Sequence, residues 1–269
     1  MRRLTLRGSP EYPTPSAIKL DILVIKKALQ RRKTPARPAA SQLWPDTRDE
    51  LERVQQDLAR AARKASPWQI PAGRPFAAAG AFIAYRRGRY GVGAAGDEAW
   101  AAAVSFVDGK RTALVTVSGT VGAPYIAGYL ALREGPLLEQ VVRQLAQPPE
   151  VLLVDATGLD HPRRAGLAIH VGAVLDLPTV GVTDRTLLAR ISEPDASRGA
   201  MAPLTIDGEV VGYGLRTQDG VKPVLVHAGW RTTPDTAARV VLAVAYRVRT
   251  PEPLREARRV AKELRARFS

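Results

Sequence analysis

The run Val151–Val154 is the strongest constraint on the fold, because its four apolar residues, VLLV, stand between two segments with helical patterns. Such a short, wholly apolar run is typical of a strand that is buried on both faces. Strands that alternate with helices along a chain form strand–helix–strand units, whose strands are parallel. We therefore expect a sheet whose central strands are covered by helices on both faces.

Other apolar runs predict hairpins on either side of this unit. Asp108-Gly109 is a tight-turn signal between two runs, and Asp207-Gly208 and Asp219-Gly220 mark later turns. Hairpins combined with strand–helix–strand units predict a mixed central β-sheet flanked by helices, which is an α/β fold. The other predicted strands cover 76–85, 100–107, 111–118 and 179–182, with short strands between 203 and 229.

Helical patterns and prolines divide the chain into three parts. Residues 1–45 form a basic, proline-rich extension with one short amphipathic segment, Ile18–Leu29. Residues 46–250 form the main domain, which begins with a helix that opens at Thr47 and ends before Pro67. Residues 251–269 form a basic C-terminal helix. The remaining predicted helices cover 124–145, 164–175 and 233–246.

The charge of the chain is concentrated at its two ends. The formal net charge is +14, and residues 1–40 contain ten Lys or Arg side chains against two acidic ones. Residues 246–269 contain eight against three, so the body between is nearly neutral. Basic ends indicate either solvated tails or contacts with the phosphates of nucleic acid, and both interpretations stay open.

The chain has no cysteine, which excludes disulfides, thiolate zinc sites and thiol nucleophiles. Any bound metal ion must therefore have oxygen or imidazole ligands. No apolar run approaches the roughly 18 residues that span a bilayer, and the N-terminus lacks the apolar core of a signal peptide. We expect a soluble cytoplasmic protein with no membrane partner, of unknown oligomeric state.

Asp155 directly follows the buried run, within the stretch VLLVDATGLDHPRR. Ligands of open α/β sheets bind beyond the carboxyl ends of the strands, so an acid at this position is a candidate functional group. A buried carboxylate without a partner is costly and needs a hydrogen bond, a counter-charge or a metal ion. The alternative is an Asp that caps the following turn through backbone amides.

Several short motifs, taken in order, closely resemble the endonuclease V family from about residue 47 to 235. PYIAG and VD followed by HPR are together quite specific. The quoted elements are Pro124-Tyr125-Ile126-Ala127-Gly128, Leu132-Arg133-Glu134, Val154-Asp155, His161-Pro162-Arg163 and Pro178-Thr179-Val180-Gly181-Val182.

The resemblance implies an RNase H-like fold and a Mg²⁺-dependent endonuclease that cuts DNA or RNA near deaminated purines, chiefly inosine. It makes Asp155 and Glu134 the catalytic, metal-binding carboxylates. Carboxylate oxygens hold Mg²⁺, which activates water and stabilises charge on phosphate.

The resemblance also assigns residues to nucleic-acid binding. The PYIAG loop corresponds to the family's wedge beside the altered base, where Tyr125 and Ile126 offer an aromatic and an apolar face. The alternative for Tyr125 is packing on the core at a helix start. The residues expected to contact nucleic acid are Pro124, Tyr125, Ile126, Gly128, His161 and Arg163.

Three positions depart from the family's pattern. Phe82 stands where the family has its first metal-binding Asp, and a phenylalanine cannot ligate Mg²⁺. Asp184 replaces a lysine, and Trp230 replaces a histidine. Asp184 or Asp97 could supply a substitute carboxylate, whereas His170 and His227 are expected to be structural.

These departures leave three hypotheses open. The first is an endonuclease V-like nuclease with weak or altered metal-dependent cleavage, linked to DNA repair. The second is a non-catalytic protein that recognises inosine-containing or distorted DNA or RNA. The third is a paralogue that acts through protein contacts. Bound Mg²⁺ is accordingly expected to be weak or absent.

Overall fold

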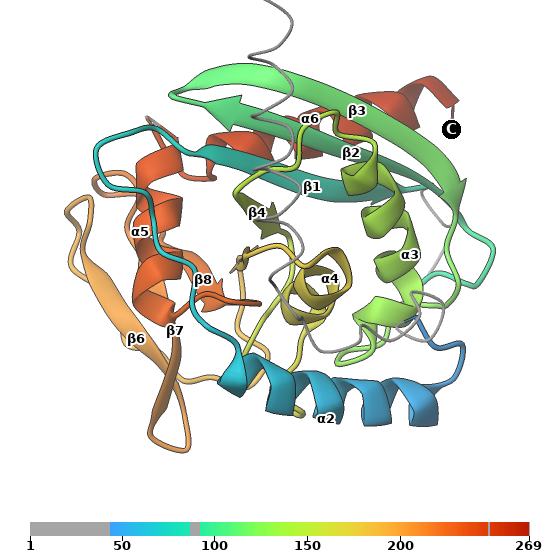
Figure 1. Cartoon of the computed structure of the whole chain (residues 1–269), viewed down its shortest axis with the longest axis horizontal. Helices are drawn as coiled ribbons and strands as arrows, with labels where there is room; N and C mark the ends of the chain where they lie inside the picture. The colour runs from blue at the N-terminus through green and yellow to red at the C-terminus, as the bar shows by residue number, and fades with distance from the viewer. Residues whose placement is uncertain (1–43, 87–91, 247, 269) are drawn as a thin grey trace, which may run out of the picture. The chain divides into compact units, whose positions relative to one another are not determined.

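The described residues fold around one mixed sheet of eight strands, in the order β3-β2-β1-β4-β5-β8-β7-β6 (Figure 1). The computed structural model describes residues 44–86, 92–246 and 248–268. The expected N-terminal segment Ile18–Leu29 lies outside the described residues. The strands are β1 Ala77–Tyr85, β2 Glu98–Val107, β3 Lys110–Thr120, β4 Val151–Val154, β5 Thr179–Thr183, β6 Met201–Ile206, β7 Glu209–Leu215 and β8 Val224–Ala228.

The predicted hairpins are confirmed. Strands β2 and β3 pair antiparallel across Asp108 and Gly109, which both adopt positive φ, 48° and 72°. Asp207 and Gly208 make the same turn between β6 and β7, at 53° and 80°. Two consecutive residues with positive φ fit the right-handed twist of hairpin strands, which is why Asp-Gly marks these turns.

The centre of the sheet is parallel, as the run Val151–Val154 predicts. Strand β4 pairs parallel with β1 on one side and β5 on the other, and all four of its residues are buried. Strand β8 then runs antiparallel to β5 and connects the centre to the second hairpin. The carboxyl ends of β4 and β5 consequently open on the same edge of the sheet.

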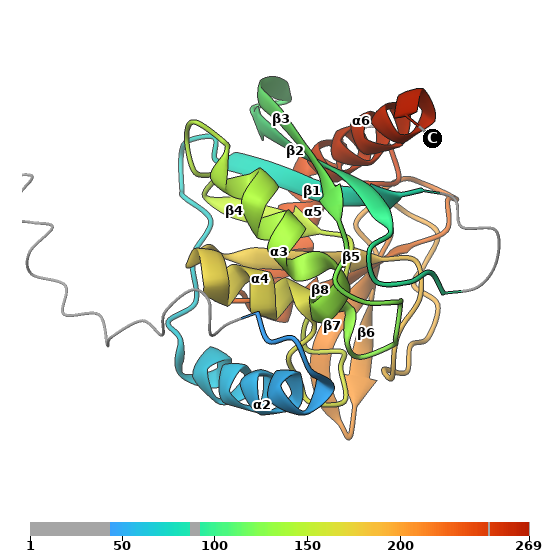
Figure 2. The same cartoon turned by 90° about the vertical axis from the view of Figure 1, so that its right-hand side faces the viewer.

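Helices cover both faces of the sheet. Alternate residues of β1 and β4 pack under α3 and α4 on one face and under α5 and α6 on the other. Figure 2 shows α3 and α6 on opposite sides of β1, with α2 outside α3 and α4. The helices are α2 Arg48–Lys64, α3 Leu130–Arg143, α4 Leu167–Leu175, α5 Pro234–Val244 and α6 Glu252–Phe268.

The C-terminal helix α6 lies directly on β1 because Gly80 has no side chain. A Cβ atom at position 80 would lie 2.3 Å from the backbone nitrogen of Leu254, in the first turn of α6. Leu254, Ala257 and Ala261 are buried against the sheet. The small residue on the strand and the small residues on the helix bring α6 close to the carboxyl end of β4.

Two predicted helix starts are wrong. Helix α3 begins at Leu130 rather than at 124, because Gly128 takes a φ of 81° and breaks the helical path. Helix α4 begins at Leu167 rather than at 164, where Arg164 has a φ of 54°. The PYIAG and HPR segments are therefore loops.

Among the described residues, no helix is both long enough and apolar enough to cross a membrane.

Candidate functional site

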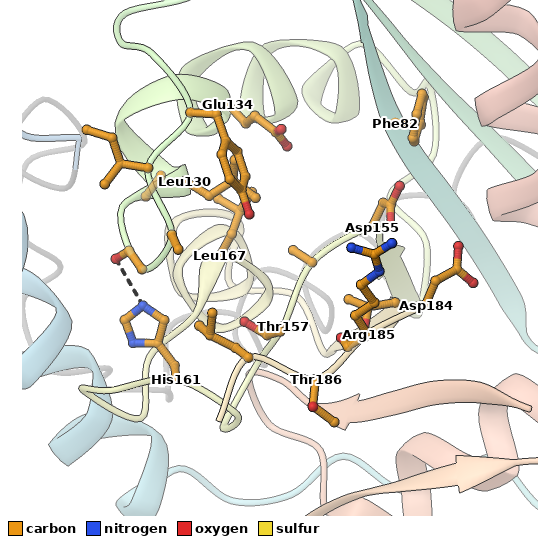
Figure 3. A pocket seen from close by; sticks show the side chains of 18 of the residues that line it. Phe82, Leu130, Glu134, Asp155, Thr157, His161, Leu167, Asp184, Arg185 and Thr186 are labelled. Atoms are coloured by element: carbon orange, nitrogen blue, oxygen red, sulfur yellow. Dashed lines mark hydrogen bonds between the residues drawn. The ribbon is translucent and has the colours of Figure 1, made fainter. Parts of the chain in front are cut away.

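A cavity of about 620 Å³ lies beyond the carboxyl ends of β4 and β5 (Figure 3). The PYIAG loop and α3 form one wall, the loop wall. Asp155, β1 and α6 form the other, the Asp155 wall. The segment after β5 closes it below. The lining residues that bear on the argument are Gln55, Phe82, Tyr125, Ile126, Gly128, Glu134, Asp155, His161, Asp184, Arg185, Arg258 and Lys262.

Phe82 and Asp155 occupy neighbouring positions on adjacent strands. In the parallel register of β1 and β4, Ala81 lies opposite Val154, and the next residue of each strand is Phe82 or Asp155. Both side chains line the cavity, and Figure 3 shows them on the same side of it. The position that should supply a second carboxylate beside Asp155 therefore holds a benzyl ring.

The carboxylate of Asp155 is paired with a cation from the C-terminal helix. Nη2 of Arg258 donates a hydrogen bond of 3.1 Å to Oδ2 of Asp155. The guanidinium carbon of Arg258 also lies 5.3 Å from the centre of the Phe82 ring. Burial raises the pKa of the Asp155 carboxyl, and Arg258 opposes that rise. The turn-cap alternative for Asp155 is wrong, since this side chain bonds to an arginine rather than to turn amides.

Glu134 faces the same cavity from α3, opposite Phe82 in Figure 3. The hydroxyl of Tyr85, at the end of β1, donates a hydrogen bond to Oε1 of Glu134. Burial raises the pKa of the Glu134 carboxyl to about 8, although the hydrogen bond from Tyr85 favours the ionised form. Near neutral pH, Glu134 therefore holds a proton for much of the time.

The proposed substitute carboxylates have other partners. Oδ1 of Asp184 forms a salt bridge of 2.7 Å with Nη2 of Arg249 at the edge of the cavity. The Asp97 carboxylate pairs with Arg133 at 3.1 Å and does not line the cavity, so the alternative that it replaces a carboxylate at position 82 is wrong. Strand β2 explains this result, because Phe82 pairs with Ala102, far along the strand from Asp97.

Trp230 lies outside the cavity and packs with Leu58 and Ile169 between α2 and α4. His227 is fully buried, and its Nε2 lies 2.8 Å from Oγ1 of Thr183. His170 is also fully buried, and its ring stacks on Trp44 at a centroid distance of 4.3 Å. Both histidines are held by packing, as expected from the sequence.

The PYIAG loop presents its aromatic residue to solvent. Tyr125 is 50% exposed at the mouth of the cavity, so the alternative that it packs on the core is wrong. Ile126 is half-buried behind it, and Gly128 is buried at the base of the loop. The loop therefore has an exposed tip on an anchored base.

Three donors converge on the carbonyl oxygen of Gly128 and anchor that base. Nε2 of His161 donates at 3.0 Å, Nη2 of Arg163 at 2.9 Å and Nε2 of Gln55 at 3.2 Å. Nδ1 of His161 accepts from the Arg163 amide, which fixes the neutral tautomer with its proton on Nε2. Burial lowers the pKa of His161 to about 4. His161 and Arg163 of the HPR motif thus hold the base of the PYIAG loop in place.

Two buried polar residues near the cavity, Gln55 and Asp160, were not predicted from the sequence. Gln55 shares the buried face of α2 with Leu51 and Leu58, so it is an amide within an apolar stripe. Asp160 is fully buried and accepts hydrogen bonds from three consecutive backbone amides, those of Leu187, Leu188 and Ala189. The second acid of VLLVDATGLDHPRR therefore has the amide-binding role that was considered for Asp155.

This arrangement does not fit a magnesium ion. Phe82 has no ligand atom, Asp155 is paired with Arg258, and Glu134 is bonded to Tyr85. Within the described ranges, no three His, Cys, Asp or Glu side chains are grouped closely enough to hold a metal ion. The metal-binding role that the resemblance implies for Asp155 and Glu134 is not shown by this geometry and stays a prediction.

A mixed sheet of this strand order with helices on both faces, shared with solved endonuclease V structures, is an RNase H-like fold. Residues 83–259 match the family model of endonuclease V. Endonuclease V of Geotalea uraniireducens is 38% identical over 230 residues, which cover 85% of this chain and 92% of that protein. The chain belongs to the endonuclease V family.

Solved structures agree with this assignment. The crystal structure of endonuclease V from Streptomyces avermitilis has a TM-score of 0.72 at 35% identity, over 84% of this chain and 96% of that one. Ciona intestinalis endonuclease V, in complex with a 24mer DNA containing an inosine followed by a ribo-adenosine, has a TM-score of 0.66 over 82% and 98%. Its identity of 21% shows likeness of fold alone. Some alignments are shorter and span 59% of one relative, from Dictyoglomus thermophilum.

Proposed function

We propose that this chain recognises deaminated purines, chiefly inosine, or other distortions in DNA or RNA, and that its metal-dependent cleavage is weak or lost. The observation that carries the second part is the pairing of Asp155 with Arg258 beside the ring of Phe82. An arginine and an aromatic ring occupy the space around Asp155 that a carboxylate-bound cation requires. Losing one positioned or electrostatic group typically costs about 10² to 10³ in rate.

The cavity and its loop support the first part of the proposal. A volume of about 620 Å³ is ordinary for a site that encloses a small ligand. Tyr125 and Ile126 present stacking and apolar surfaces at its mouth, which suit the gap left by a base that has turned out of the duplex. The three donors on the carbonyl of Gly128 keep this loop in place.

A relative strengthens the choice of inosine as the first ligand to test. Ciona intestinalis endonuclease V has been crystallised with DNA containing an inosine followed by a ribo-adenosine. Recognition of the same kind of lesion would connect this chain to DNA repair, with or without cleavage. The role of Arg163 and His161 in the proposal is to position the loop that meets the base.

A nicking assay tests the proposed loss of cleavage. The full chain is incubated with labelled inosine-containing DNA and RNA in Mg²⁺ and, separately, in Mn²⁺. We expect nicking to be absent, or at least about a hundredfold slower than by a family member that keeps an acid at the position of Phe82. Efficient Mg²⁺-dependent nicking that Asp155→Ala abolishes would overturn this part.

A binding measurement tests the recognition. Fluorescence anisotropy compares a duplex that carries one inosine with a matched duplex that does not, at fixed moderate salt. We expect tighter binding of the inosine duplex, and loss of that preference in Tyr125→Ala. Equal binding of both duplexes contradicts the proposal, and it favours the alternative of a paralogue that acts through protein contacts.

A further inference from the structure

Helix α6 carries two kinds of basic residue that differ in their partners. Its outer residues Arg255 and Arg259 are neutralised within the helix. Arg255 pairs with Glu252, and Arg259 pairs with Glu256 and Glu263, at 2.6 to 2.7 Å. Such exposed pairs within one helix contribute little to binding outside it.

Arg258 and Lys262 lie one helical turn apart, and both line the cavity, whereas Arg255 and Arg259 do not. Arg258 pairs with Asp155 of the sheet, and its Nε atom is buried without a hydrogen-bond partner among the described residues. This Nε atom is shielded from solvent, but Arg258 donates to Asp155 through Nη2 alone, so its Nη1 protons remain available to an acceptor in the cavity. The guanidinium carbon also lies 5.3 Å from the centre of the Phe82 ring, a cation–π contact that helps to hold the side chain at the cavity.

Two further cations of the cavity have no ion-pair partner among the described residues. Arg185 lines the cavity from the segment after β5, and neither Arg185 nor Lys262 forms an ion pair with a described residue. Asp184 is neutralised by Arg249 from outside. The three carboxyl groups of the cavity thus each have a partner, Arg249 for Asp184, Arg258 for Asp155 and Tyr85 for Glu134, which leaves Arg185 and Lys262 available to an anion.

We propose that Arg258, together with Lys262 and Arg185, binds a phosphodiester phosphate of the nucleic acid beside Asp155, with no divalent cation taking part. This inference rests on the proposed recognition of nucleic acid and adds how that recognition proceeds. A guanidinium held by a carboxylate on one side can still donate two hydrogen bonds to phosphate oxygens on the other. Binding of nucleic acid is accordingly independent of divalent ions.

Metal removal tests this independence directly. The affinity of the full chain for an inosine-containing duplex is measured by anisotropy in Mg²⁺ and in EDTA, at matched ionic strength. We expect the dissociation constant in EDTA to be equal to that in Mg²⁺ within about twofold, or lower, because Mg²⁺ competes for phosphates. Binding that weakens tenfold or more in EDTA overturns the inference.

Matched variants test the residues. Arg258→Gln and Lys262→Gln should each weaken binding in EDTA by about tenfold and lower the slope of log affinity against log salt by about 1. Arg259→Gln removes the same charge from the outer face and should leave both quantities unchanged. Lys262 is exposed and unpaired, so its variant folds even if the loss of Arg258 disturbs Asp155. Equal effects of the Lys262 and Arg259 variants would reduce the effect to net charge and overturn the inference.

The outcomes separate this inference from the proposed function. A wild-type chain that shows no preference for inosine contradicts the recognition itself. A chain that prefers inosine but needs Mg²⁺, or is insensitive to Arg258→Gln and Lys262→Gln, keeps the recognition and loses the phosphate site.

Discussion

The two walls of the cavity differ in how closely they follow the family's pattern. The loop wall keeps the PYIAG tip, the HPR motif and a buried set of donors on Gly128. The wall around Asp155 holds Phe82 where the resemblance implies a carboxylate, and Asp155 is paired with Arg258 of α6. The loop wall needs exact backbone positions, whereas the Asp155 wall needs only a balance of charge. An ion pair can supply that balance without a metal ion, so the proposed function predicts that recognition and cleavage can be separated by mutation.

The largest effect is expected at Asp160, which holds the segment that lies between the two walls at the base of the cavity. Its carboxylate accepts the amides of Leu187, Leu188 and Ala189 at 2.8 to 2.9 Å and holds the segment below the cavity. Asp160→Asn places an amide group against these donors and should lower the free energy of unfolding by about 3 kcal/mol. Thermal or urea unfolding measures this loss.

The exposed Asp207 provides the matched control. Its side chain is 90% exposed and lies 3.5 Å from Arg164, so Asp207→Asn should change stability by less than about 0.5 kcal/mol. Equal effects of the two variants would show that the three amide bonds of Asp160 do not stabilise the segment at the base of the cavity.

The second effect tests whether the Asp155 wall alone decides cleavage. The double variant Phe82→Asp/Arg258→Gln supplies a carboxylate beside Asp155 and removes its arginine partner. We expect Mg²⁺-dependent nicking of an inosine-containing duplex to rise by about 10². Adding Trp230→His should bring nothing further, since Trp230 packs outside the cavity. A double variant that binds the duplex but does not nick it would show that residues other than Phe82 and Arg258 also prevent cleavage.

The sequence predicts the sheet and the loop wall well, for physical reasons. Asp-Gly turns, the apolar run Val151–Val154 and the caps at Thr47 and Thr233 act through local backbone geometry, which neighbouring residues determine. The PYIAG and HPR motifs likewise lie at fixed separations, so their proximity follows from the order of strands.

The Asp155 wall was not predictable in the same way. A basic helix after Pro251 is predicted, but nothing local places Arg258 on Asp155, a residue 103 positions earlier. That contact depends on the absence of a side chain at Gly80, which lets α6 approach β1. The expected helix start at 124 was wrong for a related reason, because the conformation of Gly128 is set by three distant donors.

The third effect concerns the proton on Glu134. The carboxyl has a pKa of about 8 in the folded chain, against an ordinary value of 4.5. Between these values the folded chain holds a proton that the unfolded chain has released, so stability falls as pH rises from about 5 to 8. Glu134→Gln cannot ionise and should remove about 2 kcal/mol of this fall, because Tyr85 and partial solvation moderate the full effect.

Melting temperatures measured across that pH range for the wild type and the variant give the difference. Glu263→Gln is the control, since this exposed residue of α6 only pairs with Arg259. Parallel profiles for wild type and Glu134→Gln would mean that Glu134 is ionised near neutral pH. An ionised Glu134 would be a better metal ligand, which would count against the proposed loss of metal binding.

The smallest effect tests the support of the loop wall by Gln55. Its amide donates to the Gly128 carbonyl at 3.2 Å, and its Oε1 accepts from Nε of Arg163 at 2.6 Å. Gln55→Ala removes one of three donors and frees the Arg163 side chain, so the preference for inosine should fall by about threefold to tenfold while cleavage stays unchanged. The neighbouring, exposed Gln56→Ala controls for the loss of an amide from α2. Anisotropy with inosine and matched duplexes measures both variants, and an equal loss in both would show that the loop wall does not depend on this buried network.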